Sequence, residues 1–257
     1  MGVYTGEITS SDIASDNPIH QRLFFGYFKS QDYVKGDILE LGCGTGRGLE
    51  ILLKAGKSYT ALDKNQPLIR EHQRNYPKAN FINANMPPFK GVADGSVDSV
   101  VTFHVIEHIQ DHEKFVSEIY RVLRPNGIAV ISTPNKRLRL ARNPWHVREY
   151  FKSELETLVK TKFKNVEMLG IAGNEKAMAY FEENRKSVDK IMKYDFLKLQ
   201  YALPAALLRK PYEYLNRRNR NKLMDENTSL ASEIDYTDYF LSENDEQCLD
   251  HFFICRK

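Results

Sequence analysis

The feature that most constrains the fold is an apolar segment that runs directly into four alternating glycines. Residues 37–41 have the composition of a short strand, and Gly42, Gly44, Gly46 and Gly48 follow them. Alternating glycines allow tight turns and a close approach of the backbone to a ligand, because no Cβ stands in the way. The stretch predicts a strand followed by a nucleotide-binding loop, and it indicates an enzyme.

A second apolar run supplies an acidic residue at a telling distance. Residues 58–62 form this run, and Asp63 follows them directly, 21 residues after Gly42. This is about the spacing that places an acid beside a ribose in a βαβ unit. A dinucleotide site requires G-x-G-x-x-G, whereas these glycines run G-x-G-x-G-x-G, so a pyrophosphate site is disfavoured. An ordinary strand-to-helix turn is the alternative to a binding loop.

Four further motifs follow in order along the chain. They are Asn83-Ala-Asn-Met-Pro-Pro-Phe89, the run from Asp94 to His108, Arg121-Val-Leu-Arg-Pro-Asn-Gly127 and Ser132-Thr-Pro-Asn135. Together with the glycine loop and Asp63, they closely resemble the class I S-adenosylmethionine-dependent methyltransferases. Flanking pieces extend the resemblance toward a bacterial subgroup of small-molecule, lipid or sugar O-methyltransferases: Thr5-Gly-Glu7, His20-Gln-Arg22, residues 143–150 and residues 248–257.

The resemblance implies S-adenosylmethionine as cofactor, S-adenosylhomocysteine as product, and a set of cofactor-binding residues. That set is Gly42, Cys43, Gly44, Gly46, Asp63, Lys64, Asn83, Ala84, Phe103 and His104. The glycines would pass beneath the methionine part and the ribose, and Asp63 would hold the ribose hydroxyls. Asn83 stands where the family usually has an aspartate facing the adenine, and a neutral acceptor is weaker than a charged one.

Three histidines are candidate catalytic residues: His104, His108 and His146. An imidazole with a pKa near ~6.5 can take a hydroxyl proton and contribute roughly 10²- to 10⁴-fold. A structural role is the alternative for His108, and anchoring of the surrounding loop on the core is the alternative for residues 143–150. The spacing of His104, His108 and His112 suggests a metal site on one helix face. Because His104 is expected at a strand end, no metal is predicted.

Apolar runs alternate with helix-period segments, which predicts an α/β fold with a parallel sheet. Strands are expected near 38–42, 58–62, 79–83, 97–103, 128–132 and 164–171, and helices near 46–55, 66–75, 112–124 and 152–161. The resemblance implies a Rossmann-like, seven-stranded sheet in the order 3-2-1-4-5-7-6 with helices on both faces. Its last strand, at 249–256, would be antiparallel.

The chain is expected to divide into three parts. Residues 1–35 form an N-terminal helical lid, residues 36–173 with 248–257 form the S-adenosylmethionine-binding catalytic domain, and residues 174–247 form a helical insertion. The insertion far exceeds the usual ~2 to 6 residue connection and so requires structure of its own. We expect it to recognise the substrate or to form an interface.

The bulk composition is that of one large catalytic unit. The 257 residues include 42% hydrophobic residues, enough for a full core. Neither an apolar stretch of ~20 residues nor a basic-then-apolar N-terminus is found, so a cytoplasmic location is expected. The three cysteines are odd in number and show no C-x-x-C pair, which argues against a disulfide framework and a zinc site.

The net charge of +3 is too modest to imply nucleic-acid binding. Residues 209–222 nevertheless carry six Lys or Arg against one Glu, and residues 223–250 carry nine acids without Lys or Arg. These blocks could pair with each other. The mixed apolar and basic stretch 196–222 suits peripheral contact with a membrane surface, binding of an anionic or lipid-linked acceptor, or an oligomer contact.

These features together predict transfer of a methyl group from S-adenosylmethionine to a hydroxyl of a small-molecule, sugar or lipid-linked acceptor. The oxygen preference comes from the resemblance, because the cradle serves nitrogen and carbon nucleophiles equally. One alternative is an RNA methyltransferase using residues 209–222, although no RNA-binding module accompanies them. Another is a non-catalytic protein that binds S-adenosylmethionine. The oligomeric state stays open.

Overall fold

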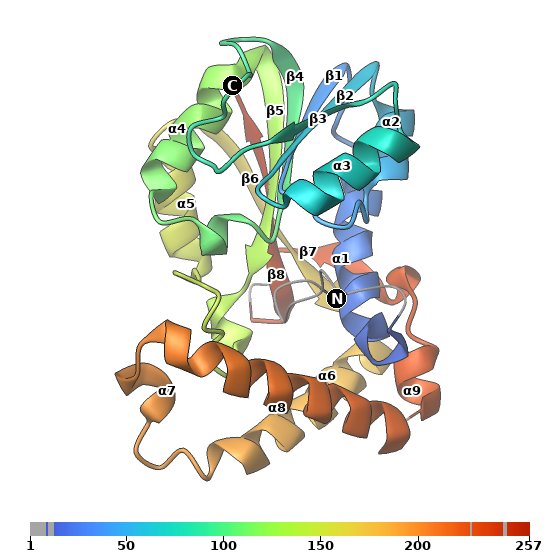
Figure 1. Ribbon diagram of the computed structural model, residues 1–257, viewed down its shortest axis with the longest axis vertical. Coiled ribbons are helices and arrows are strands. Elements are labelled where there is room, and N and C mark those ends of the chain that lie inside the picture. Colours follow the sequence, from blue (N-terminus) through green and yellow to red (C-terminus); the bar gives the residue numbers. More distant parts are fainter. Residues whose placement is uncertain (1–8, 10–12, 227, 244–245) are drawn as a thin grey trace.

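A mixed sheet of eight strands forms the centre of the computed structural model, which describes residues 9, 13–226, 228–243 and 246–257 (Figure 1). The order across the sheet is β3-β2-β1-β4-β5-β8-β6-β7. The strands are β1 (Asp37–Leu41), β2 (Ser58–Asp63), β3 (Asn80–Asn83), β4 (Val97–Phe103), β5 (Leu123–Pro134), β6 (Asn165–Gly173), β7 (Tyr239–Ser242) and β8 (Cys248–Arg256). β1 to β5 are parallel, and β8 runs antiparallel to both β5 and β6.

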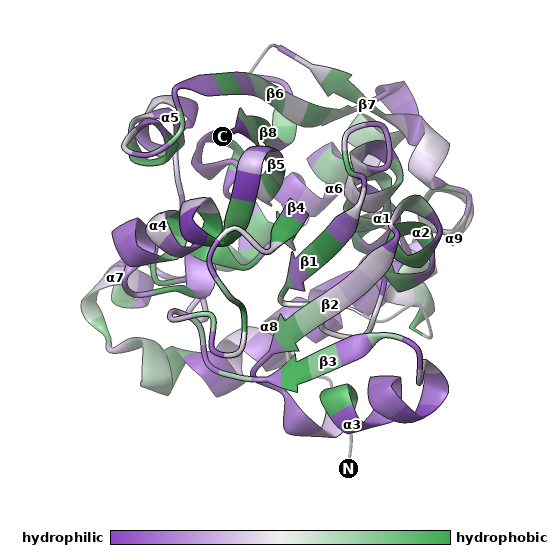
Figure 2. Cartoon of the chain, turned by 90° about the horizontal axis from the view of Figure 1, so that it is seen from above, coloured by the Kyte–Doolittle hydropathy of each residue, from purple (hydrophilic) through white to green (hydrophobic). Residues whose placement is uncertain are grey.

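The middle of the sheet is covered on both faces, which explains its apolar strands. β4 and β5 carry near-continuous buried residues, and Figure 2 shows hydrophobic segments along them. Strands buried on both faces read as apolar runs rather than as alternating patterns. One face packs against α1 (Asn17–Ser30), α2 (Leu49–Ala55) and α3 (Gln66–Asn75), the other against α4 (His112–Val122) and α5 (Lys152–Lys160).

Helix α4 illustrates how the sequence sets an element. Asp111 is its N-cap, and the Asp111 carboxylate accepts a hydrogen bond of 3.0 Å from the Lys114 amide. Phe115, Val116 and Ile119 are fully buried on one face. The helix ends at Val122, two residues before the predicted end, because Leu123 already pairs with Val97 at the start of β5.

The predicted strand order is correct for seven strands, with β8 in the place of the seventh. The prediction missed β7, which pairs antiparallel with β6 through Ile171 and Leu241. This strand lies in the segment expected to be helical. It is four residues long, too short to show a periodic pattern, and it pairs with backbone groups that an uncovered edge would leave exposed.

The rest of the long connection is helical, as expected. It contains α6 (Glu175–Met192), α7 (Leu199–Ala202), α8 (Ala205–Glu226), α9 (Thr228–Ser232) and the 3₁₀ helix η4 (Tyr236–Asp238). Figure 1 shows α6 and α8 crossing the end of the sheet toward which the parallel strands point. Further 3₁₀ helices are η1 (Ala14–Asp16), η2 (Ile106–His108) and η3 (Lys136–Leu138).

Ion pairs attach α8 to the start of the chain. Arg217 and Arg220 each place a guanidinium nitrogen 2.8 Å from Oδ1 of the buried Asp16. Two cations of the basic block 209–222 therefore pair with η1, whereas Lys222 pairs with Glu226 of the acidic block 223–250 at 3.7 Å. Among the described residues, none of the helices combines the length and the apolar character needed to cross a bilayer.

Candidate active site

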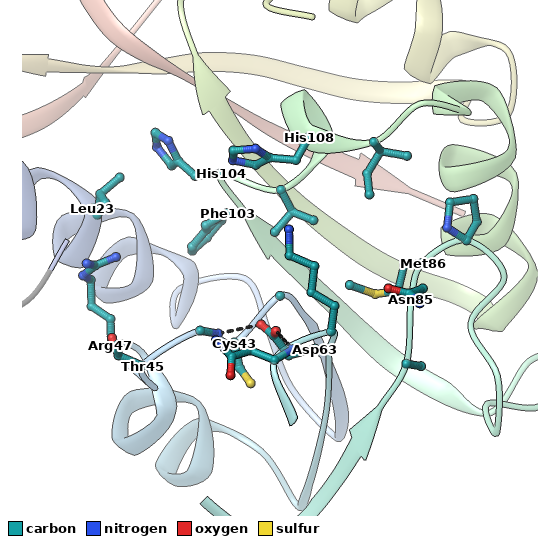
Figure 3. A pocket seen from close by; sticks show the side chains of 18 of the residues that line it. Leu23, Cys43, Thr45, Arg47, Asp63, Asn85, Met86, Phe103, His104 and His108 are labelled. Atoms are coloured by element: carbon teal, nitrogen blue, oxygen red, sulfur yellow. Dashed lines mark hydrogen bonds between the residues drawn. The ribbon is translucent and has the colours of Figure 1, made fainter. Parts of the chain in front are cut away.

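A cavity of about 580 Å³ opens at the carboxyl ends of β1, β2 and β4. Open α/β sheets bind ligands at this edge. Figure 3 shows Cys43 and Asp63 on one side of this cavity, with His104 and His108 across from them. We call it the cofactor cavity.

The glycine loop forms the floor of the cofactor cavity. The amide of Gly42 donates a 2.7 Å hydrogen bond to the Leu62 carbonyl, which ties the loop to β2. A Cβ on Gly42 would lie 2.3 Å from Cγ2 of Val105. Gly44 has a φ of +49°, and its Cβ would meet no atom within 4 Å. Because Gly44 lines the cavity, a side chain there would occupy ligand space.

Asp63 is held at the cavity wall by two backbone amides. Its Oδ2 accepts from the Gly44 amide at 2.9 Å and its Oδ1 from the Asn65 amide at 2.7 Å. The residue is only 8% exposed, yet it lines the cavity. Each carboxylate oxygen can accept more than one hydrogen bond. Asp63 is therefore oriented to receive two vicinal hydroxyls.

Most of the predicted cofactor residues line this cavity. They are Gly42, Cys43, Gly44, Asp63, Lys64, Ala84, Phe103 and His104. Gly46 and Asn83 do not line it. The side-chain amide of Asn83 donates to the Asp63 carbonyl at 3.0 Å, so it braces β2 instead of facing the cavity. Asn85 and Met86, two and three positions further on, take the place at the wall.

The sequence did not predict that residues of α1, of the loop before α2 and of the N-terminal segment complete the cavity. Thr9, Leu23 and Tyr27 line it, and so does Arg47. Arg47 donates to the carbonyl of Thr9 at 3.0 Å and to its hydroxyl at 2.7 Å, which brings the N-terminal segment to the cavity. Residues 1–8 and 10–12 of the expected lid, including Thr5-Gly-Glu7, lie outside the described residues.

His104 is a partly buried cation at the end of β4. It has a φ of +55°, a conformation uncommon for residues other than glycine. Its Nδ1 lies 3.4 Å from Glu107 and its Nε2 lies 3.5 Å from Asp250, which also pairs with Arg22 at 3.1 Å. Burial alone would lower the pKa of His104, but Asp250 and Glu107 outweigh it and raise the pKa to about 9.

Glu107 is a buried anion that several groups share. The Thr133 hydroxyl donates to it at 2.9 Å. Burial alone would raise the pKa of Glu107, but the hydrogen bond and charge of His104, together with His108 and His146, lower it to about 2. Glu107 is therefore ionised at neutral pH beside three imidazoles.

His108 lines the cofactor cavity, and its ring orientation follows from its partner. Its Nδ1 lies 3.0 Å from the Trp145 carbonyl, which can only accept, so Nδ1 carries a proton. In the neutral ring, Nε2 is then the nitrogen that can take a proton. The ring of His146 meets that of His108 edge-on, with centroids 5.0 Å apart.

His146 has protein partners at both ring nitrogens. Its Nδ1 lies 2.7 Å from Glu149 and its Nε2 lies 2.8 Å from the Asn143 amide nitrogen. Potential ligand atoms of Glu107, His108 and His146 lie within 4.8 Å of one another. A metal ion could bind there only by breaking the hydrogen bonds of His146. The expectation that no metal is bound stays a prediction. His112 instead packs edge-on against Tyr150, with centroids 5.5 Å apart.

Comparison with known proteins agrees with this geometry. Residues 39–131 match the model of a methyltransferase domain. Probable S-adenosylmethionine-dependent methyltransferases of Mycolicibacterium smegmatis and Mycobacterium tuberculosis are 35% and 34% identical over 65% of this chain. The chain spans 67% and 63% of their lengths. A ubiquinone biosynthesis O-methyltransferase of Rickettsia conorii is 32% identical over 42% of this chain and 38% of its own.

A solved structure supports the fold across nearly the whole chain. An S-adenosylmethionine-dependent methyltransferase of Thermotoga maritima, a possible histamine N-methyltransferase, superposes with a TM-score of 0.57 at 14% identity. The match covers 93% of this chain and 91% of that one. The bare Gly44 backbone and the oriented Asp63 carboxylate fit S-adenosylmethionine, the cofactor that the relatives' names state. The chain therefore belongs to the class I S-adenosylmethionine-dependent methyltransferases.

Proposed function

We propose that this protein transfers a methyl group from S-adenosylmethionine to a hydroxyl of a small-molecule, sugar or lipid-linked acceptor. The observation that carries the proposal is His108, an imidazole on the cofactor cavity whose Nδ1 is fixed by the Trp145 carbonyl. A base held in one tautomer at the reaction site is what a hydroxyl nucleophile requires. Amine nucleophiles that are already neutral need no such base.

The cofactor supplies the activated methyl group, and the protein supplies position and a proton acceptor. When bound, S-adenosylmethionine carries the methyl group on a positively charged sulfur. Asp63 would hold the ribose hydroxyls of the cofactor, and the glycine loop would lie beneath its methionine part and ribose. As the acceptor oxygen takes the methyl group, its proton passes to Nε2 of His108. Positioning alone can supply roughly 7 to 11 kcal/mol in such a transfer.

Glu107 and His104 support this step in different ways. The Glu107 carboxylate lowers the free energy of the His108 imidazolium that forms when the proton arrives, since the two groups attract each other. His104 has a pKa of about 9 and is already protonated at neutral pH, so it is unsuited to act as a base. We assign it the role of fixing Glu107 and Asp250. His146 is then a positioning residue for His108.

Two further features support a hydroxyl acceptor over RNA. One relative is named as an O-methyltransferase of ubiquinone biosynthesis. In addition, the basic block 209–222 has two arginines paired with Asp16 and a third, Arg209, stacked 4.1 Å over the ring of Trp145. Cations engaged in this way are poorly placed to neutralise phosphates. An RNA acceptor and a non-catalytic binding role are the alternatives to test.

We also propose that the tip of the insertion, residues 190–210, contacts a membrane surface. Tyr194, Phe196 and Leu207 are 87%, 80% and 65% exposed. Besides Arg209, which stacks on Trp145, residues 190–210 carry four Lys and one Asp, so the tip suits a surface of anionic lipids. The lid assignment of residues 1–35 likewise remains a proposal, supported by the contact of Arg47 with Thr9.

The experiment that tests the function uses purified protein, methyl-labelled S-adenosylmethionine and an extract of the native cells. Lipid, small-molecule, nucleic-acid and protein fractions are then separated. Label in lipids or polar small molecules, stable to mild alkali as a methyl ether is, supports the proposal. Label in RNA would favour the RNA alternative. Absence of label despite cofactor binding would favour a non-catalytic protein.

A further inference from the structure

A second cavity, of about 290 Å³, lies between the sheet edge and the helical insertion. Its walls come from the ends of β5 and β8, the loop over residues 138–149, α6 and α8. The volume is close to the lower end of the ~300 to 1,000 Å³ range of small-molecule sites. The cofactor residues described above do not account for it.

Most of this cavity is apolar. Leu140, Phe181, Val188, Ile191, Met192 and Leu215 line it, contributed by the loop and both helices. Its arginines already have carboxylate partners: Arg22 with Asp250 at 3.1 Å, Arg139 with Glu149 at 3.5 Å and Arg220 with Asp16 at 2.8 Å. Paired charges leave little net field for an ionic ligand. The lining therefore selects an uncharged, apolar body.

One end of the cavity is polar and adjoins the cofactor cavity. His146 and Glu149 line the second cavity, whereas His108 and His104 line the first. The edge-on contact of His108 with His146 joins the two sites. The Glu149 side chain is 6% exposed, and its buried Oε2 lies 3.5 Å from Arg139 Nη1 in an ion pair but accepts no hydrogen bond from the described residues. An unsatisfied buried acceptor of this kind calls for a donor from a ligand.

We infer that the second cavity is the acceptor chamber, and that its occupant is an uncharged amphiphile with an apolar alkyl, prenyl or aryl body and a hydroxylated head. The head donates a hydrogen bond to Glu149 and presents its reacting hydroxyl to His108. The body lies between α6 and α8. This inference rests on the proposed function for the identity of the reacting group, but binding in the chamber can be measured without any turnover.

The test measures calorimetric binding of 4-n-alkylphenols, from methyl to octyl, to the full chain without cofactor. Each added methylene should tighten binding about fourfold, the equivalent of ~0.8 kcal/mol, until the chamber is filled. Ile191→Trp fills the chamber and should weaken 4-octylphenol binding at least tenfold. Lys190→Trp adds the same ring at the neighbouring, exposed position and should leave binding unchanged.

Val188→Phe is a second filling variant from the same helix, and S-adenosylmethionine binding reports whether each variant is folded. Affinity that does not depend on chain length, or a chain-length dependence that persists in both filling variants, would overturn the chamber assignment. Normal chain-length dependence in a protein that binds no S-adenosylmethionine would instead overturn the proposed function and leave the chamber in place. The two failures are thereby distinguishable.

Discussion

His104 and His108 lie four positions apart in the sequence and meet different partners. His104 lies between two buried carboxylates, which favour its charged form. His108 is oriented by a neutral carbonyl and lines the cofactor cavity. We therefore propose that the same type of side chain is a fixed cation at position 104 and a proton acceptor at position 108. Either assignment can be tested at the residue concerned.

Replacing His108 with Ala should lower the rate of methyl transfer by about 10²- to 10⁴-fold, because the proton acceptor is lost. The affinity for S-adenosylmethionine should stay close to that of the wild type. Rates of label transfer and calorimetric titration measure the two quantities. His112→Ala is the matched control, since His112 packs against Tyr150 and lines neither cavity. Wild-type turnover in His108→Ala would end the base hypothesis.

The pKa shifts of His104 and Glu107 predict how stability depends on pH. The pKa of His104 is raised from 6.5 to about 9, so its stabilising contribution is complete below pH 6.5 and is lost as pH rises through 9. The pKa of Glu107 is lowered from 4.5 to about 2, so its contribution is present above pH 4.5 and is lost as pH falls through 2. The sum of the two stabilising contributions is therefore largest between pH 4.5 and pH 6.5.

Urea unfolding between pH 6.5 and 10 should therefore show a decline of about 3 kcal/mol attributable to His104. His104→Gln removes the cation between Glu107 and Asp250 and should reduce the free energy of unfolding by about 3 to 5 kcal/mol near pH 6. It should also flatten the alkaline decline. Parallel pH curves for the two proteins would show that the shift in the pKa of His104 is absent.

At the scale of elements, the loop between β1 and α2 can be tested with two glycines. Gly44 and Gly95 have φ values of +49° and +56°, and a Cβ on either would meet no atom within 4 Å. Only Gly44 lines the cofactor cavity. Gly44→Ala and Gly95→Ala should each reduce stability by about 1 to 2 kcal/mol. Only Gly44→Ala should weaken S-adenosylmethionine binding, by about tenfold or more, in a calorimetric titration.

Equal cofactor affinity in the two alanine variants would mean that the loop is an ordinary strand-to-helix turn. The sequence could predict this loop because its strand, its glycines and Asp63 lie within one βαβ unit. The sequence placed Asn83 beside the adenine, whereas its side chain turns away from the cavity and donates to the Asp63 carbonyl of the neighbouring strand. It missed β7 because four residues carry no pattern and the pairing partner lies about 70 residues away.

At the scale of the whole molecule, the features that sequence could not predict are those made by distant segments. The charge on His104 depends on Asp250, near the end of the chain. The contact of His108 with His146 depends on a loop that Val147 fixes to the Glu107 carbonyl at 2.7 Å. The second cavity depends on α8 being attached to Asp16. The sequence could identify His104, His108 and His146 as candidates, but it could not identify the residues that each of them contacts.

The exposed tip of the insertion predicts that the whole protein associates with anionic membranes. At low salt it should co-sediment with vesicles containing phosphatidylserine and stay in the supernatant with phosphatidylcholine alone. The double variant Tyr194→Ser, Phe196→Ser should lose most of this binding. Phe240→Ser, which removes a 45% exposed aromatic ring from β7, is the control. Wild-type protein that remains in the supernatant, or that only self-associates, would contradict the proposed surface contact.

We propose that the cavity at the ends of β1, β2 and β4 holds S-adenosylmethionine through Asp63. Calorimetric titration of the wild type and of Asp63→Ala with S-adenosylmethionine tests it most directly. We predict one site per chain in the wild type and a loss of affinity of roughly tenfold to a hundredfold in the variant, since hydrogen bonds to a charged acceptor are removed. Equal affinity in both proteins, or no binding by the folded wild type, would contradict the claim.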